Sequence, residues 1–579
     1  MSGRKGINLI TVFFMIILLA NVTAPTSGAS YSPPTTTLRI GLSIGTNIIP
    51  SANLMNVDNM GSGYEFGYFD NRDFISIGAW TGETRITMLM DRNMIWNPTA
   101  DEGRGQYQEG SAGDVVVGCF HVQLNAGYNT FEEARAEAAN YQGAFVRYQS
   151  SQQTPFLVLI GNHTTRAAAD NAIVSLGIGS AAQVNAGTSN TITVTRTGTN
   201  VILFEFDRGA TPFGIMPRAS GSEKPETMFK GYRYNGGFQY SRQNGAELSV
   251  VNIVNIEDYV KGILPYEMNN AWPIEALKAQ ALCARTYALS NLNRHSADGA
   301  DLCVYEHCQV YRGRNAANAT TDQAVDETVG LYVTYNGQLA QTFYASTNGG
   351  ASENVENVWA ESVPYLRGVI DPYEADVAPR LSSYYWTIKY TPAQLTERLK
   401  LRITGFNLST IASMKVTRYS ATGNAIEVTL TDVNGKSTTL SRRSQILAGL
   451  GTPTMRFDIG GAAWGPGSIF VNDPGQPLPP GSDFYGIGAD GAPVSVPRDN
   501  MYAITGSGSA APVDGEVTTG GGSSNGMVNG VFVINGAGNG HQVGMSQWGA
   551  YSMAFYHNLK YEDIIHFYFT GVEITKTGS

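Results

Sequence analysis

The stretch LPYEMNNAWPIEALKAQALCARTYAL, from Leu264 to Leu289, decides how the rest of this 579-residue chain is interpreted. Pro273 follows Trp272 at the point where a helix is expected to begin, because a first-turn proline loses no needed N–H group and presets φ. An apolar stripe then recurs at spacings of four, three and four residues, which is the period of a helix face; it consists of Leu277, Ala281, Ala284 and Ala288. The stretch therefore predicts a loop that carries Glu267, followed by a well-specified helix.

Glu267 is the candidate catalytic residue of this stretch. It is a single carboxylate in an apolar setting of Leu264, Pro265, Tyr266 and Met268. Lys278 and Arg285 lie seven residues apart and so share one helix face, whereas Gln280 lies about 200° around from Lys278 and would have to reach from the flank. Composition alone favours a partly exposed loop residue over a catalyst for such a glutamate.

Three sequence blocks resemble the SpoIID/LytB family of bacterial cell-wall proteins. The first is IEDYVKGILPYEMNNAWPIEALKAQALCARTYAL (256–289). YASTNGG (344–350), followed by VPYLRGVIDP, and GNGHQVGMSQWGAYSMA (538–554) resemble the other two blocks of the family, in the same order. The resemblance extends over roughly 232–572, with an upstream start at LRIGLSIG (38–45). It implies an α+β fold with a β-rich catalytic domain.

The second and third blocks supply the other candidate binding residues. In the second block, Ser346, Thr347, Asn348 and Gly349 are small, so that backbone N–H groups and short donors can face a ligand closely. Asn-Gly is also the strongest short hairpin signal, so a simple turn is the alternative. In the third block the candidates are His541, Met545, Ser546 and Gln547, with an orienting or packing role favoured for the histidine. Family members usually read His-Gly-Val where this chain has His541-Gln542-Val543.

The resemblance implies a lytic transglycosylase that cleaves glycan strands already stripped of their stem peptides. Ordinary glycosidases need two carboxylates, but one suffices if the 6-hydroxyl of muramic acid attacks its own anomeric carbon. Glu267 would first protonate the leaving oxygen and then accept the hydroxyl proton, while Lys278 and Arg285 hold the sugar carboxylate. The alternatives are a LytB-like enhancer, which binds the wall and stimulates an N-acetylmuramoyl-L-alanine amidase, and a structural wall scaffold.

A group of metal-ligand residue types follows the helix in NRHSADGADLCVYEHCQVYRG. His295, Cys303, His307 and Cys308 fall within fourteen residues, and thiolates with imidazoles are the ligands that tetrahedral zinc prefers. A Cys303–Cys308 disulfide is the competing interpretation, because exported proteins oxidise their thiols. Some family members carry a zinc site in this loop, with an HC pair followed by QVY as here, so the resemblance favours one structural Zn²⁺. Cys119 and Cys283 are expected to be buried thiols.

A second, smaller domain is predicted at 115–180. VVVGCFHVQL leads into TFEEARAEAANY, and PFLVLIGNH leads into TTRAAADNAIVSLG, so a strand followed by a helix occurs twice. Thr130 and Glu133 form a capping box at the first helix. The pattern predicts a ferredoxin-like βαββαβ fold and resembles the SPOR domain, whose family binds denuded glycan on its sheet face. That resemblance makes His121, Gln123 and Tyr128 candidates.

The remaining organisation suits an exported protein. Residues 1–29 contain Arg4 and Lys5 before an apolar run, which predicts either a cleaved signal peptide or a membrane anchor. Residues 31–114 predict an N-terminal β segment, 190–459 the SpoIID-like core, 460–530 a Gly/Pro/Ser-rich insertion, and 531–575 the last motif. The net charge of -10 argues against a nucleic-acid partner. We therefore expect a cell-wall or extracellular location, with attachment to the outer face of the cytoplasmic membrane only through the N-terminal segment.

Overall fold

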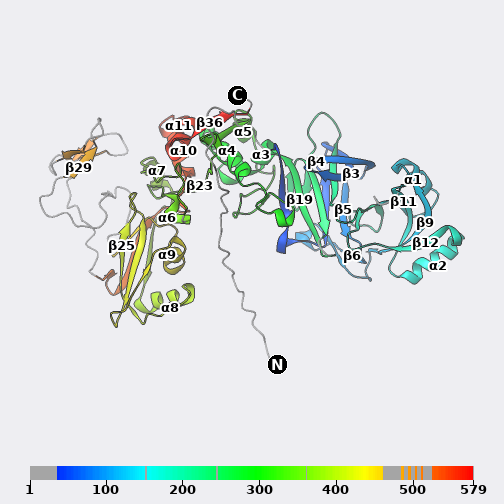
Figure 1. Ribbon diagram of the computed structural model, residues 1–579, viewed down its shortest axis with the longest axis horizontal. Helices are drawn as coiled ribbons and strands as arrows, with labels where there is room; N and C mark the ends of the chain where they lie inside the picture. The colour runs from blue at the N-terminus through cyan, green and yellow to red at the C-terminus, as the bar shows by residue number, and fades with distance from the viewer. Residues whose placement is uncertain are drawn as a thin grey trace.

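The computed structural model describes residues 35–149, 153–242, 245–359, 361–460 and 525–577, together with the backbone pairing of four short strands between 484 and 512. The chain combines sheets with separate helices, in agreement with the predicted α+β class (Figure 1). The predicted signal or anchor, 1–29, and most of the predicted insertion, 460–530, lie outside the described residues. Among the residues that the structure describes, no helix has both the length and the apolar character that crossing a membrane requires.

Two large sheets share one hydrophobic core in the N-terminal half. One sheet has the order β20-β1-β19-β18-β15-β3-β4, with bounds Leu302–Cys303, Thr37–Ser43, Leu248–Asn255, Gly237–Arg242, Phe213–Ala219, Gly61–Asp70 and Asp73–Thr81. The other runs β12-β9-β11-β10-β14-β13-β5-β2-β16-β17, with bounds Ala182–Ala186, Phe120–Tyr128, Phe156–His163, Ala144–Gln149, Ile202–Asp207, Ile192–Arg196, Arg85–Met90, Ser51–Asn56, Thr227–Phe229 and Tyr232–Tyr234. Phe66 and Phe204, one from each sheet, stack with ring centroids 4.8 Å apart. The two sheets therefore pack face to face on aromatic side chains.

The predicted βαββαβ element order is present between β9 and β12. Helices α1 (Phe131–Ala138) and α2 (Arg166–Leu176) connect the strands, and the sheet order β12-β9-β11-β10 is the ferredoxin-like arrangement. Thr130 and Glu133 form the predicted capping box at α1. Strand β10 also pairs in parallel with β14, so that this module continues the ten-stranded sheet rather than forming a separate one.

The face of the module's sheet that lies opposite α1 and α2 is covered. On this face Phe145, Leu157 and Leu159 form a core with residues of the preceding segment, including Met94 and Tyr107. The covering strands are β6 (Met94–Asn97), β7 (Gln106–Glu109) and β8 (Val116–Val117). His121 is fully buried on this face and Gln123 is 8% exposed. The prediction that these two residues bind glycan on an open sheet face is therefore wrong; Tyr128 lies half-buried at the end of β9.

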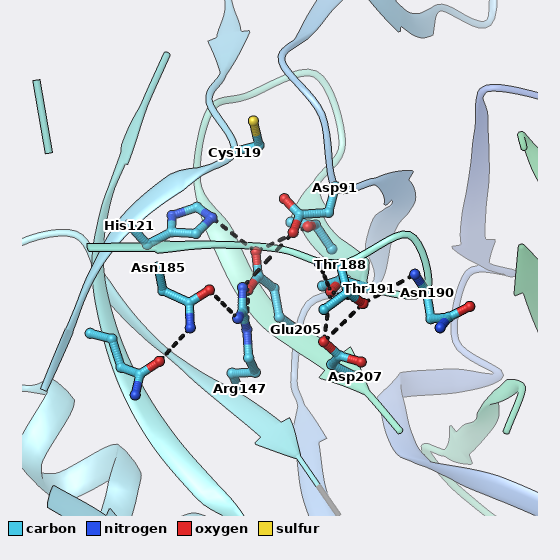
Figure 2. A network of polar contacts seen from close by, with 12 residues as sticks. Asp91, Cys119, His121, Arg147, Asn185, Thr188, Asn190, Thr191, Glu205 and Asp207 are labelled. Carbon is cyan, nitrogen blue, oxygen red and sulfur yellow. Dashed lines mark hydrogen bonds and ion pairs between the residues drawn. The ribbon is translucent and has the colours of Figure 1, made fainter. Parts of the chain in front are cut away.

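A buried polar network fills the rest of this covered face (Figure 2). Glu205 of β14 accepts a hydrogen bond from Arg147 Nε of β10 at 2.7 Å and one from the Thr193 hydroxyl at 3.0 Å. His121 Nε2 lies 3.2 Å from the same carboxylate, and its Nδ1 lies 2.7 Å from the carbonyl of Gly161. Side chains of the module and of the preceding and following strands thus share one set of buried charges.

A group of packed helices follows the last long strand of the seven-stranded sheet, β19. Helix α3 (Ile256–Glu267) follows β19 directly, and α4 (Ile274–Ser290) begins immediately after Pro273, as predicted. Helix α5 (Ala319–Asp326) lies against both, and the last helices, α10 (Gln547–Tyr556) and α11 (Tyr561–Tyr568), lie beside α4 (Figure 1). The hairpin of β21 (Leu331–Tyr335) and β22 (Gln338–Leu339) pairs with β36 (Glu573–Lys576). The end of the chain is thereby joined to the region of the first motif.

A second hydrophobic core lies between the second and third motifs. It is built from β24 (Tyr385–Tyr390), α8 (Pro392–Arg402), β25 (Ile411–Tyr419), β26 (Ala425–Asp432), β27 (Ser437–Leu440), α9 (Arg443–Leu450) and β28 (Phe457–Ile459). Strand β34 (Val531–Ala537), paired with β33 (Met527–Val528), contributes Phe532 and Ile534 to this core and then leads into the third motif. The predicted 190–459 core thus contains two hydrophobic cores.

Candidate functional site

Glu267 lies at the C-terminal end of α3, where the chain turns before α4. Its Oε1 accepts a hydrogen bond from the backbone N–H of Val310 at 3.2 Å. Burial raises the pKa of Glu267, whereas hydrogen bonds with Val310, Tyr344 and Gln547 act in the opposite direction. The net effect is a carboxyl group whose pKa is higher than usual, which favours the protonated form that a general acid needs.

The three sequence blocks meet at Glu267. Strand β23 (Tyr344–Ala345), from the second block, pairs in parallel with β35 (Met545–Ser546), from the third. This pairing brings Tyr344 and Gln547 to the carboxyl group that the first block supplies. Gln547 also donates from Nε2 to Oε1 of the fully buried Gln280 at 3.4 Å. Two predicted site residues, Gln280 and Gln547, therefore lie in one chain of contacts that ends at Glu267.

Gln309 supports this arrangement, and the sequence analysis did not single it out. Its Oε1 accepts from the Tyr259 hydroxyl at 3.2 Å, and its Nε2 donates to the Tyr344 hydroxyl at 3.1 Å. Val310, the next residue, supplies the N–H group that reaches Glu267. The available signal is the QVY sequence directly after the His-Cys pair, which also marks the metal loop.

The structure does not place Lys278 and Arg285 as free cations. Arg285 is fully buried, and its Nη2 lies 2.6 Å from Oε2 of Glu257. Lys278 Nζ forms ion pairs with Glu275 at 3.1 Å and with Glu327 at 2.7 Å. Both charges are compensated within the protein, so the prediction that these residues bind a substrate carboxylate is corrected to a structural role.

The loop of the second block encloses a carboxylate of the protein itself. The N–H groups of Asn348 and Gly349 donate to the two oxygens of buried Glu374 at 2.6 and 2.9 Å. The Ser546 hydroxyl, which also caps α10, donates to the same carboxylate. The donors predicted to face a ligand are therefore used internally. Glu374 lies outside the three blocks that guided the prediction, and for that reason it was missed.

The other predicted residues of these blocks also have internal contacts. Thr347 Oγ1 accepts from the N–H of Asn539 at 2.7 Å, and the carbonyl of half-buried Ser346 accepts from the N–H of Trp548 at 3.1 Å. Met545 is buried, with its sulfur 4.0 Å from that of Cys283. These contacts join the second block to the third and the third block to α4, which is a structural role.

His541 packs between aromatic rings. The ring centroid of Trp359 lies 5.1 Å away, and His541 Nδ1 accepts from the N–H of Val543 at 3.1 Å. Burial and the nearby charge of Arg443 lower the pKa of His541 to about 4. The ring is therefore neutral near neutral pH, in keeping with the orienting or packing role favoured for it.

The four predicted metal ligands come together in one loop. His295 Nε2 lies 3.5 Å from Cys308 Sγ, and His307 Nδ1 lies 3.6 Å from Cys308 Sγ and 3.8 Å from Cys303 Sγ. All four ligand atoms lie within 4.8 Å of one another, and both cysteines are free thiols. Zn–S bonds of about 2.3 Å and Zn–N bonds of about 2.0 Å in a tetrahedron imply N···S separations of roughly 3.6 Å. The residues present thus fit a closed zinc site.

Comparison with known proteins shows the family to which this chain belongs. The family model described as SpoIID, Stage II sporulation protein, matches residues 244–335. The chain is 31% identical over 351 residues to an uncharacterised protein of Brachyspira hyodysenteriae, with 59% of this chain and 73% of that protein covered. This protein belongs to the SpoIID/LytB family.

Two named SpoIID/LytB relatives come from Bacillus subtilis. The amidase enhancer is 27% identical over 329 residues, covering 55% of this chain and 40% of the enhancer. Stage II sporulation protein D is 32% identical over 176 residues, covering 28% of this chain and 50% of that protein. The chain thus spans half or less of the length of these two relatives, and family membership supports a cell-wall-related function.

Proposed function

We propose that this SpoIID/LytB-family protein is a lytic transglycosylase that cleaves denuded peptidoglycan glycan strands, with Glu267 as general acid and then general base. The observation that carries the proposal is the buried setting of Glu267, which raises its pKa while Val310, Tyr344 and Gln547 hold it in place. A protonated carboxyl group at neutral pH is the requirement of the first step.

In the proposed reaction the Glu267 carboxyl proton passes to the glycosidic oxygen as the bond from that oxygen to the muramic anomeric carbon breaks. The oxygen of the muramic 6-hydroxyl forms a new bond to the anomeric carbon, and its proton passes to the Glu267 carboxylate. The products are a free 4-hydroxyl end and a 1,6-anhydro-muramic end. Water is not consumed, and Glu267 regains its starting protonation state.

The test compares wild type, Glu267→Gln and Glu306→Gln on peptidoglycan predigested by an amidase, with the released fragments analysed by mass spectrometry. Glu306 is an exposed carboxylate whose charge also raises the pKa of Glu267, so it is the matched control. We expect anhydro-muramic ends from wild type and Glu306→Gln, and a loss of about 10²-fold or more in Glu267→Gln. If the wild type released fragments with reducing ends, and Glu306→Gln abolished them, the reaction would instead be a hydrolysis that uses both Glu267 and Glu306.

A second candidate function is a non-catalytic enhancer that binds the wall and stimulates an N-acetylmuramoyl-L-alanine amidase. It is favoured by the similarity to the Bacillus subtilis amidase enhancer. In the same experiment this function would appear as binding of wild type to strands without release of fragments, and as faster peptide release when an amidase is added. Either function requires export, for which the apolar run within 1–29 is the sequence basis.

We also propose that His295, Cys303, His307 and Cys308 hold one structural zinc ion. The ion would supply no reaction step but would fix the loop that leads into Gln309 and Val310. The hydrogen bond between the two thiols lowers the pKa of Cys303 and raises the pKa of Cys308, so Cys303 is the one of the pair that is disposed to be a thiolate.

A further inference from the structure

Helix α10 carries large aromatic side chains outside its buried face. The buried face comprises Gln547, Gly549, Ala550, Ser552 and Met553. The other face carries Trp548, Tyr551 and Phe555, which are spaced three and four residues apart and therefore share one side of the helix. Phe555 is 53% exposed. Trp548 and Tyr551 are half-buried. A surface helix usually places polar residues on this side, so a row of aromatic rings that reaches the surface at Phe555 requires an explanation.

The rings form a continuous row. Trp272, from the loop that follows Glu267, lies with its centroid 4.6 Å from that of Trp548, which in turn lies 5.4 Å from that of Tyr551. Tyr551 stacks on Phe555 at 5.3 Å, and Phe555 contacts Tyr556 at 4.9 Å. Within the described chain, the four rings of α10 belong to none of the hydrophobic cores. Their ring contacts are with one another, with Trp272 and, for Tyr556, with Arg380. Trp548, Tyr551 and Tyr556 are half-buried and Phe555 is exposed, so part of the row's surface is open to a ligand.

The row begins at the candidate catalytic site. Gln547, the first residue of α10, contacts Glu267, and Trp548 comes next in the chain. Phe555 lies seven positions after Trp548, which is about 10 Å along a helix axis. The row therefore starts beside the carboxyl group and extends away from it.

An exposed cation lies at the far end of the row. The Arg380 guanidinium lies over the Tyr556 ring, 5.2 Å from its centroid. Arg380 forms no ion pair among the residues whose side chains the structure describes. A ligand that follows the rings away from Glu267 would thus meet apolar faces first and then a positive charge.

We propose that Trp272, Trp548, Tyr551, Phe555 and Tyr556, with Arg380, bind a denuded glycan strand in subsites beyond the bond that is cut. This inference rests on the proposed function, because it uses the same substrate and extends the same site. The C–H faces of sugar rings pack on aromatic rings, and the free carboxylate of each muramic acid is a partner for an arginine. An uncharged glycan strand would pack on the rings only, whereas a denuded strand would pack on the rings and also form an ion pair with Arg380.

The test measures strand binding in a Glu267→Gln background, so that binding is read without cleavage. The variants are Tyr551→Ala with Phe555→Ala, and Arg380→Gln, while Leu401→Ala serves as the control because Leu401 is a 78% exposed apolar residue of α8. The probes are amidase-digested glycan strands of graded length and chitin oligomers of matched length. Circular dichroism and thermal melting check that each variant is folded.

We expect the double substitution to weaken binding of long strands of both kinds about tenfold, while disaccharide binding and the control remain unchanged. Arg380→Gln should weaken binding of denuded strands and leave chitin oligomers unaffected. Unchanged strand affinity in the folded double variant would overturn the proposal. A double variant that still binds strands but no longer binds a purified amidase would also overturn it, because the rings would then form a protein-docking face. If the rings are needed for strand binding but the wild-type protein releases no fragments, the subsites are supported and the transglycosylase proposal is rejected.

Discussion

At the scale of single residues, Gln542 occupies a backbone conformation that favours glycine. Its φ is +66°, and the family pattern has glycine at this position. The side chain explains how glutamine is tolerated here. Its Nε2 donates to the carbonyl of Asn348 at 2.8 Å and to Asn424 Oδ1 at 3.0 Å, and its Oε1 accepts from the N–H of Met455 at 2.9 Å. These bonds join the second block to the second core.

Replacing Gln542 tests this account. Gln542→Gly relieves the backbone strain but leaves three buried partners without their bonds, so we expect a loss of about 2 kcal/mol in the free energy of unfolding. Gln542→Ala removes the same bonds and keeps the strained φ, so it should be the less stable variant by about 1 kcal/mol. Chemical denaturation measures both. A glycine variant more stable than wild type would show that the bonds contribute little.

The hydroxyl of Tyr344 is one of the groups that adjust the pKa of Glu267. Its hydrogen bond lowers the pKa of Glu267, so Tyr344→Phe should raise that pKa further. Since the proposed reaction begins with protonated Glu267, kcat/KM should fall as pH rises through this pKa, and the falling limb should move to higher pH in the variant. Tyr390→Phe, which removes a hydroxyl bonded to the carbonyl of Leu450, should leave the limb in place. A limb that does not move, or that moves to lower pH, would contradict the assignment.

The sequence allowed some of these residues to be found and not others. Glu267 stood out because it lies in the first family block; its apolar neighbours alone would have favoured an ordinary loop residue. Gln280 and Gln547 were named from the family blocks, but their contact with each other depends on the packing of α10 against α4. Glu374 binds the loop of the second block through space from 24 or more residues away. Contacts of this kind have no local pattern that the sequence could display.

At the scale of elements, the central helix α4 shows why two binding residues were misassigned. Helical spacing correctly placed Lys278 and Arg285 two turns apart, but it could not tell which faces would be covered. In the structure nearly every residue from Ala276 to Leu289 is buried, because α3, α5, α10 and α11 all pack on α4. A basic residue in such a helix needs an internal carboxylate, which Glu257 provides for Arg285.

The metal loop links a proposed zinc ion to the carboxyl group of Glu267, the proposed catalytic residue. Cys308 is followed by Gln309 and Val310, which contact Tyr344 and Glu267. Cys308→Ala should therefore remove about one zinc per chain, lower the melting temperature and reduce strand cleavage about tenfold or more, although Glu267 is intact. Elemental analysis, thermal melting and the fragment assay measure these effects.

Cys119→Ala is the matched control for the metal loop, because Cys119 is a half-buried thiol in the βαββαβ module. It should keep the zinc and the activity. If the wild-type chain is purified without zinc, and Cys303 and Cys308 resist thiol reagents until a reductant is added, the disulfide alternative is correct.

At the scale of the whole molecule, the βαββαβ module is a fixed part of the ten-stranded sheet. Two strand-and-helix repeats were enough to predict its element order. The covering of its sheet face could not be predicted in this way, because the covering residues come from β6 to β8, which precede the module and carry no motif. Candidate glycan contacts are therefore concentrated at Glu267 and along α10.

Glu205 is the residue on which this attachment can be tested. It is fully buried between Arg147 and His121, so Glu205→Gln leaves a buried arginine without its main charged partner (Figure 2). We expect a loss of about 3–5 kcal/mol in the free energy of unfolding, against less than about 1 kcal/mol for Glu427→Gln in the more exposed pair with Arg418. Because β10 and β14 belong to one sheet, the module and the N-terminal strands should still unfold in a single transition, followed by circular dichroism. If Glu205→Gln instead shows a separate early unfolding transition, and the free energy of the main transition changes by less than about 1 kcal/mol, the module is only loosely attached.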